Sequence, residues 1–155
     1  MPQLSAHERV LLDTSVISAF VNGEMRPTEA VAFRALLQRQ AAGHLTFLAS
    51  TVSLEEIRAI PLAYRSSHLR EYESMANIRE VDPTPSDNRE NLALLTLLRD
   101  ENDARLLTQC QRAGVSVFLT LDERTILQKA SEVEAACGVK AQSPTQYFSA
   151  TLRSA

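Results

Sequence analysis

The chain has 155 residues, a net charge of −3, and 45% hydrophobic residues. This length and composition predict a single domain, residues 1–155, with its own buried core. We find no long apolar run and no basic leader followed by an apolar segment, so we expect a cytoplasmic protein without membrane association. Cys110 and Cys137 lie far apart and have no nearby second cysteine, which argues against a disulfide framework or a cysteine zinc site.

Short apolar runs predict the strands of the fold. Three runs have the length and branching of strands buried on both faces, namely residues 10–12, 45–49 and 115–119. Residues 78–81 and 139–141 are weaker candidates. Helical segments lie between them, and strands joined by helical crossovers pair in parallel. The sequence therefore predicts an α/β fold, a three-layer sandwich around a mainly parallel sheet of four to five strands.

Apolar side chains recur at helical spacing in the connecting segments. In residues 28–42 we expect Val31, Leu36 and Leu37 to recur along one helix, and residues 90–99 form a second helix that Ser86 or Asp87 can cap. Residues 123–136 predict a further helix.

Two acidic residues follow predicted strands. Asp13 ends the first strand and precedes Thr14 and Ser15, and Asp122 follows the fourth strand. Ligands of open parallel sheets bind at the carboxyl ends of the strands, so both acids are candidate site residues. For Asp13 a helix N-cap is an equally good interpretation. Thr120 is expected on the same side as Asp122, with its hydroxyl orienting a water or contacting a phosphate.

A third acid lies on a predicted helix after the second strand. Glu56 shares a face with Val52 and the half-buried Ile60, whereas Glu55 should face water. Ser50 or Thr51 can cap this helix. A carboxylate on a core-facing stripe needs a partner, and a metal ion is one possibility.

Asp103 stands at the start of another predicted helix. The apolar positions expected to face the sheet are Leu106, Leu107 and Cys110. A purely electrostatic role is the alternative, because acids stabilise a helix N-terminus.

Several carboxylates in one place repel each other unless a cation neutralises them. Oxygen ligands select hard ions such as Mg²⁺ or Mn²⁺, and the histidines His7, His44 and His68 are scattered and expected on the surface. Such a site hydrolyses phosphodiesters, with one or two ions stabilising the attacking and leaving oxygens. The sequence has no nucleotide-binding glycine loop and no Ser-His-Asp or Cys-His arrangement.

These residues, in this order, resemble the PIN-domain family, especially the VapC-type toxins of prokaryotic toxin–antitoxin pairs. LLDTSVISAF is similar to the family's first strand and acid, and STVSLEEI to its helix ending in Glu. NDARLLTQCQRAGVSVFLTLDE is similar to its third acid, helix and Thr-x-Asp strand end, and SPTQYF resembles its closing Ser-Pro helix. The resemblance spans residues 10–148.

The resemblance implies a PIN-like α/β/α sandwich and an endoribonuclease that depends on Mg²⁺ or Mn²⁺. It assigns catalysis and metal binding to four acids and support to four neighbours. The acids are Asp13, Glu56, Asp103 and Asp122, and the neighbours are Thr14, Ser15, Thr120 and Glu123.

Two positions depart from the family pattern. The family often places a further Asp and then an aromatic residue after Asp122, whereas Arg124 and Thr125 stand here. Glu123 either supplies the extra acid or leaves a second metal site weak. Arg105 stands where the family commonly has a small or apolar residue, and it either contacts phosphate or lies on the solvent face.

Residues 57–81 carry apolar residues between arginines and predict one or two helices over the sheet edge. Ordinary packing is the favoured interpretation, although comparable helices of such toxins contribute to a dimer and an antitoxin groove. Tyr64, Tyr72, Arg65 and Arg70 are the alternative RNA contacts, together with Arg105 and Arg124.

The leading hypothesis is an endoribonuclease toxin with an RNA substrate, a small antitoxin partner and a homodimeric assembly. A PIN ribonuclease of RNA processing without an antitoxin is a second hypothesis, and a catalytically silent PIN-like scaffold that binds RNA or protein is a third. The net charge of −3 counts against nucleic-acid binding, whereas 14 of the 16 basic residues are Arg, the better bidentate phosphate partner.

Overall fold

The computed structural model describes residues 8–61, 70, 79–81 and 88–154. In this part of the chain five strands pair in parallel in the order β3-β2-β1-β4-β5. The strands are β1 (Glu8–Leu12), β2 (Leu45–Ser50), β3 (Arg79–Val81), β4 (Val117–Leu119) and β5 (Lys140–Gln142). Each predicted strand overlaps one of them, so the expected parallel α/β sheet is confirmed.

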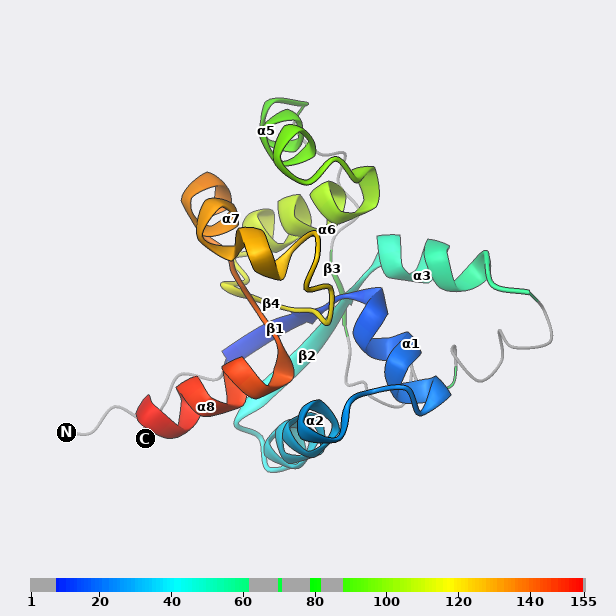
Figure 1. The fold of residues 1–155 in the computed structure, drawn as a ribbon, viewed down its shortest axis with the longest axis vertical. Coiled ribbons are helices and arrows are strands. Elements are labelled where there is room, and N and C mark those ends of the chain that lie inside the picture. The colour runs from blue at the N-terminus through cyan, green and yellow to red at the C-terminus, as the bar shows by residue number, and fades with distance from the viewer. Residues whose placement is uncertain (1–7, 62–69, 71–78, 82–87, 155) are drawn as a thin grey trace.

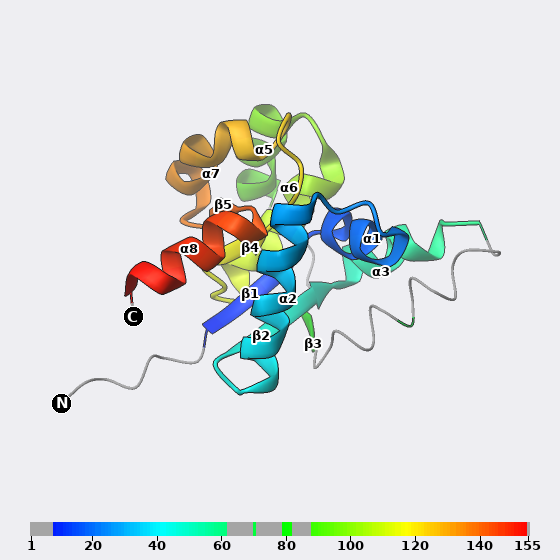
Figure 2. The same ribbon diagram turned by 60° about the horizontal axis from the view of Figure 1, so that its bottom comes forward.

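Helices cover both faces of the sheet, as a three-layer sandwich requires. The helices are α1 (Thr14–Asn22), α2 (Pro27–Ala41), α3 (Thr51–Arg58), α5 (Asn88–Leu98), α6 (Glu101–Arg112), α7 (Ala130–Cys137) and α8 (Pro144–Ser154). Figure 1 shows α5, α6 and α7 on one side of the strands and α1, α2 and α8 on the other. Figure 2 shows α2 and α8 side by side on their face, where they also make extensive contacts.

The core divides into two layers because alternate side chains of each strand point to opposite faces. Leu11 and Phe118 pack with α5, α6 and α7, whereas Val10 and Leu119 pack with α1, α2 and α8. These side chains are fully buried. Burial on both faces explains why the strands are continuous apolar runs rather than alternating ones.

The expectation that Val31 belongs to the buried face of α2 is wrong. Val31 is 66% exposed, whereas Ala32, Phe33 and Leu36 are buried. The ring of Phe33 lies between Phe20 and Phe47, with centroid distances of 5.3 and 5.5 Å. Packing of this large ring sets the rotation of the helix and turns Val31, two positions earlier, to the outside.

The helix predicted over residues 123–136 begins later than expected. Residues 123–126 form turns, a 3₁₀ turn covers Leu127–Lys129, and α7 starts at Ala130. The Asp122 carboxylate accepts a hydrogen bond from the Thr125 amide at 3.0 Å. This side chain captures a backbone donor locally, which competes with immediate helix formation.

Other expectations have mixed outcomes. Helix α5 matches the second predicted helix, and His44 is exposed as expected. Among the described residues no helix is long and apolar enough to cross a membrane. Some predictions concern residues outside the described ranges, namely His7, Tyr64, Arg65, His68, Tyr72, Ile78, Ser86 and Asp87.

The two sides of α2 should respond differently to truncation. We expect Leu36→Ala to lower the free energy of unfolding by about 2–5 kcal/mol, because it leaves a cavity in the core. Val31→Ala should change it by less than about 0.5 kcal/mol. Urea denaturation followed by circular dichroism measures both, and equal losses would contradict the observed rotation of the helix.

Candidate acidic site at the carboxyl edge of the sheet

The strand order reverses between β1 and β4, because the chain builds β2 and β3 on one side of β1 and β4 and β5 on the other. Such a switch point leaves a crevice beyond the strand ends, where open α/β sheets bind ligands. Asp13 follows β1 there, and its amide donates to the Leu119 carbonyl at 2.8 Å. Asp122 lies shortly after β4 at the same edge. The topology therefore brings these two predicted acids together.

Asp13 is a buried carboxylate held by hydroxyl groups. Its side chain belongs to a residue only 6% exposed and makes no N-cap hydrogen bond to α1. Instead Oδ2 accepts from Thr120 at 2.7 Å and from Ser15 at 2.8 Å. Burial raises the pKa of Asp13, these hydroxyl bonds lower it, and the charge of Asp122 raises it further. The Asp13 side chain therefore does not cap α1, and its functional role stays a prediction.

Thr120 and Ser15 connect the two acids. The Thr120 hydroxyl donates to Asp13 and accepts from the Asp122 amide at 3.0 Å. The Ser15 hydroxyl accepts from the Leu121 amide at 3.2 Å. Thr120 is fully buried and its hydroxyl fixes Asp13, whereas its contact with a water or a phosphate stays a prediction.

Glu56 projects from α3 toward the start of α1. Ser50 caps α3 by accepting from the Val52 amide at 2.9 Å, as expected. Glu56 Oε1 accepts from the Thr14 hydroxyl at 2.8 Å, and Ser53 Oγ lies 2.9 Å from the same hydroxyl. Burial raises the pKa of Glu56, the Thr14 bond lowers it, and the charge of Asp13 raises it. The half-buried position of Glu56 agrees with its predicted helix face.

Asp103 completes the group from the N-terminus of α6. Burial, together with the charges of Asp13, Asp100, Asp122 and Glu56, raises its pKa to about 7. The structure therefore brings Asp103 within electrostatic range of each of the other three predicted acids. The leucines and cysteine predicted to face the sheet from this helix are buried.

Asp100 is a member of this group that the sequence reasoning did not select. Its carboxylate caps α6 by accepting from the Asp103 amide at 2.9 Å, and its charge raises the pKa of Asp103 and Glu56. The sequence feature that could have identified Asp100 is the spacing Asp-x-x-Asp at the start of a helix. This spacing indicates a helix cap as readily as a functional site.

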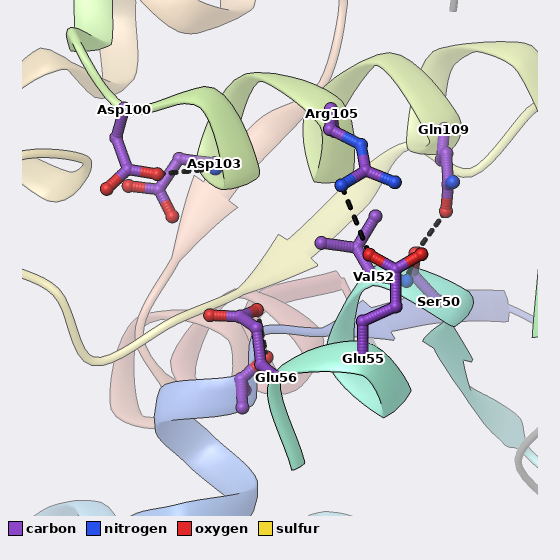
Figure 3. Close-up of polar contacts among 9 residues, drawn as sticks. Ser50, Val52, Glu55, Glu56, Asp100, Asp103, Arg105 and Gln109 are labelled. Atoms are coloured by element: carbon purple, nitrogen blue, oxygen red, sulfur yellow. Dashed lines mark hydrogen bonds and ion pairs between the residues drawn. The ribbon is translucent and has the colours of Figure 1, made fainter. Parts of the chain in front are cut away.

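Two polar contacts join the acid-bearing helices α3 and α6 (Figure 3). The buried Ser50 hydroxyl donates to the Gln109 side-chain carbonyl, and Arg105 pairs with Glu55 at 3.2 Å. The Arg105 charge also lowers the pKa of Glu56. Arg105 is partly exposed and pairs with a carboxylate, and its contact with phosphate stays a prediction.

The remaining predicted residues are exposed. Glu123 pairs with Arg26 at 3.2 Å, and both side chains are largely exposed. Arg124 and Arg70 are exposed as well.

The donor set fits a hard divalent cation that keeps much of its water. Among the described residues no three His, Cys, Asp or Glu side chains are spaced to hold a metal ion by themselves. Mg²⁺ is commonly bound through one or two carboxylates plus waters and substrate phosphates, so a closed cage is not required. Burial is the main cause of the raised pKa values of Asp13, Glu56 and Asp103, and the charges of neighbouring acids add to it, so a nearby cation would favour the ionised forms.

The fold and the site define a class: an α/β/α sandwich whose parallel sheet gathers carboxylates at its switch point. The chain belongs to the PIN domain family, whose model matches residues 10–132. PIN domains are generally nucleases and usually use divalent metal ions.

A solved structure with the same fold supports the assignment. A chain in the crystal structure of VapBC2 from Rickettsia felis, bound to a DNA fragment from their promoter, aligns with a TM-score of 0.55. The identity is 11%, and the alignment covers 87% of this chain and 98% of that chain. At this identity the likeness concerns the fold. No curated protein matches the sequence of this chain.

The acid group should make stability depend on pH when no metal is present. Because folding raises the pKa of Asp103 from 3.8 to about 7, the folded state binds its proton more tightly than the unfolded state. Stability is then highest below about pH 4 for this group and falls as pH rises through about 7. In EDTA, we expect Asp103→Asn to flatten this fall and to gain stability relative to the native chain at pH 8.

Urea denaturation at pH 5, 6, 7 and 8 measures this effect. Glu132→Gln is the matched control, because Glu132 is exposed on α7. An unchanged pH slope in Asp103→Asn would contradict the assignment of the titration to this group.

Proposed function

We propose that this chain is an endoribonuclease that depends on Mg²⁺ or Mn²⁺. The observation that carries the proposal is the convergence of Asp13, Glu56, Asp103 and Asp122 from separate segments at one switch point. The mutual repulsion of these carboxylates lowers the stability of the fold. Such unfavourable clusters of charge are found mostly at functional sites. Membership of the PIN domain family supports nuclease chemistry at this position.

The chain's own residues hold and orient the acids. Thr120 and Ser15 fix Asp13, and Thr14 fixes Glu56, so the carboxylate oxygens are aimed before any ligand arrives. A bound divalent cation would supply the Lewis acidity that phosphodiester hydrolysis needs. We assign metal binding to the four acids and support to Thr14, Ser15 and Thr120. Glu123 supports the site from its exposed edge.

We further propose that the chain is a toxin with a small antitoxin partner, acting as a homodimer in the cytoplasm, and that its 155 residues form one domain. The shared fold with a VapBC2 chain, together with the family, supports this assignment. A ribonuclease of RNA processing would use the same site. Only the presence or absence of an antitoxin partner distinguishes that hypothesis from the toxin.

A silent scaffold is the second candidate. The spacing of the described acids favours it, since no three are positioned as ready metal ligands. In that case the carboxylates would have only a structural role.

Cleavage of RNA tests the activity. We expect the purified chain to cut a mixture of structured and unstructured RNAs with Mg²⁺ or Mn²⁺ but not with EDTA. Asp13→Asn and Asp122→Asn should reduce the rate by about a hundredfold or more, because each removes a charge from the site. Glu132→Gln, which removes an exposed charge on α7, is the matched control.

Binding of Mn²⁺ is measured in parallel by the electron paramagnetic resonance signal of the free ion. Metal-dependent cleavage and Mn²⁺ binding that both fail in Asp13→Asn would support the enzyme. Absence of both in the native chain would instead support the silent scaffold.

The toxin assignment predicts a growth phenotype. Induced production of the native chain in a bacterial host should slow growth, whereas Asp103→Asn at the same protein level should not. Growth curves with immunoblot quantification provide the measurement. Equal inhibition by both chains would show that toxicity does not come from this site.

A further inference from the structure

A cavity of about 370 Å³ opens beside Asp122. Its walls come from the start of α2, the turns after β4 and the residue that follows β5, Ser143. Two of these three walls are at the carboxyl edge of the sheet, next to the acid group. If the chain cleaves RNA as proposed above, the nucleotide flanking the cut lies within reach of this cavity.

Part of the lining is apolar. Met25, Leu121 and Leu127 line the cavity and are each partly buried. Apolar surface offers contact to the flat face of a ring, and a guanidinium plane serves the same purpose where aromatic side chains are absent. Arg26 and Arg124 line the same cavity and provide such planes.

The charges of the lining argue against a phosphate. Its acids are Glu24, Glu29, Asp122 and Glu123, which outnumber the two arginines. Arg26 is moreover paired with Glu123 at 3.2 Å. This pair is exposed and therefore weak, so it can open for a ligand. A neutral group that offers N–H donors to carboxylates fits this lining better than an anion does.

We propose that this cavity is a base pocket that prefers guanine in the nucleotide next to the scissile phosphate. Guanine combines a donor edge, N1–H and the N2 amino group, with the acceptors O6 and N7. Carboxylates accept from base donors, and Arg bonds bidentately to O6 and N7. With Asp122 assigned to the metal, Glu24, Glu29 and Glu123 remain as acceptors for the donor edge of this base, and the two arginines are donors for O6 and N7.

Binding of guanosine tests the pocket without metal or cleavage. We expect guanosine and guanosine 5′-monophosphate to shift the amide resonances of Leu121, Leu127 and Ser143 in ¹⁵N-correlated NMR spectra. Adenosine, cytidine and uridine should bind at least fivefold more weakly, and inorganic phosphate should leave these resonances unchanged.

Variants connect the shifts to the cavity. Leu127→Trp fills it and should abolish the guanosine shifts. Leu92→Trp is the matched control, because Leu92 is 58% exposed on α5 and is not among the lining residues. Arg124→Ala removes only an exposed side chain, so it should weaken binding at least fivefold even if Leu127→Trp does not fold.

Sequencing the ends of cleaved RNA gives the second readout. Guanine should be enriched at one position beside the cut, and Leu127→Trp or Arg124→Ala should lose this enrichment while Leu92→Trp keeps it. No guanosine shift, shifts that survive in both pocket variants, or shifts with phosphate alone would overturn the proposal. Cleavage without guanosine binding rejects only the pocket, whereas guanosine binding without cleavage rejects only the nuclease.

Discussion

The buried carboxylate of Asp13, at the switch point of the sheet, determines which groups must surround it. Asp13 is nearly inaccessible, and an ionised group in that position is costly unless hydrogen bonds or a cation compensate. Thr120 and Ser15 supply two hydroxyl donors from the neighbouring strand end and the following helix. These donors are neutral, so they orient the charge of Asp13 without cancelling it.

The other acids also lie beside uncharged or acidic groups. Glu56 is held by a threonine hydroxyl, and Asp103 follows a helix cap formed by Asp100, another acid. Arg105 is the cation whose charge lowers the pKa of Glu56, and it is already engaged with Glu55. Among the described residues, Arg105 is thus the cation whose charge acts on Glu56, and under the proposed function a bound metal ion would supply further positive charge.

The sequence predicted the sheet, and the position of Asp13 and Asp122 at its carboxyl edge, because both follow from local pattern. Continuous apolar runs identify buried parallel strands, and an acid directly after such a run lies at the carboxyl edge whatever the strand order. The strand order itself comes from long-range pairing, so the partner of Thr120 was not predictable. The rotation of α2 likewise depends on the contacts of Phe33 with Phe20 and Phe47. Phe20 and Phe47 lie in other elements, so the spacing of apolar residues within α2 could not predict the contacts.

The acidity of the chain bears on how it would recognise RNA. Binding through phosphates alone needs a surplus of cations, and a net charge of −3 does not provide it. Contacts to a base escape this limit, because a nucleobase is neutral and its N–H groups are attracted to carboxylates. An acidic lining that repels a phosphate therefore suits a pocket for a base, while the metal site takes the phosphate. If both proposals hold, affinity for the RNA backbone depends on the bound metal ion. Selection among RNA sequences then depends on the side chains of the base pocket.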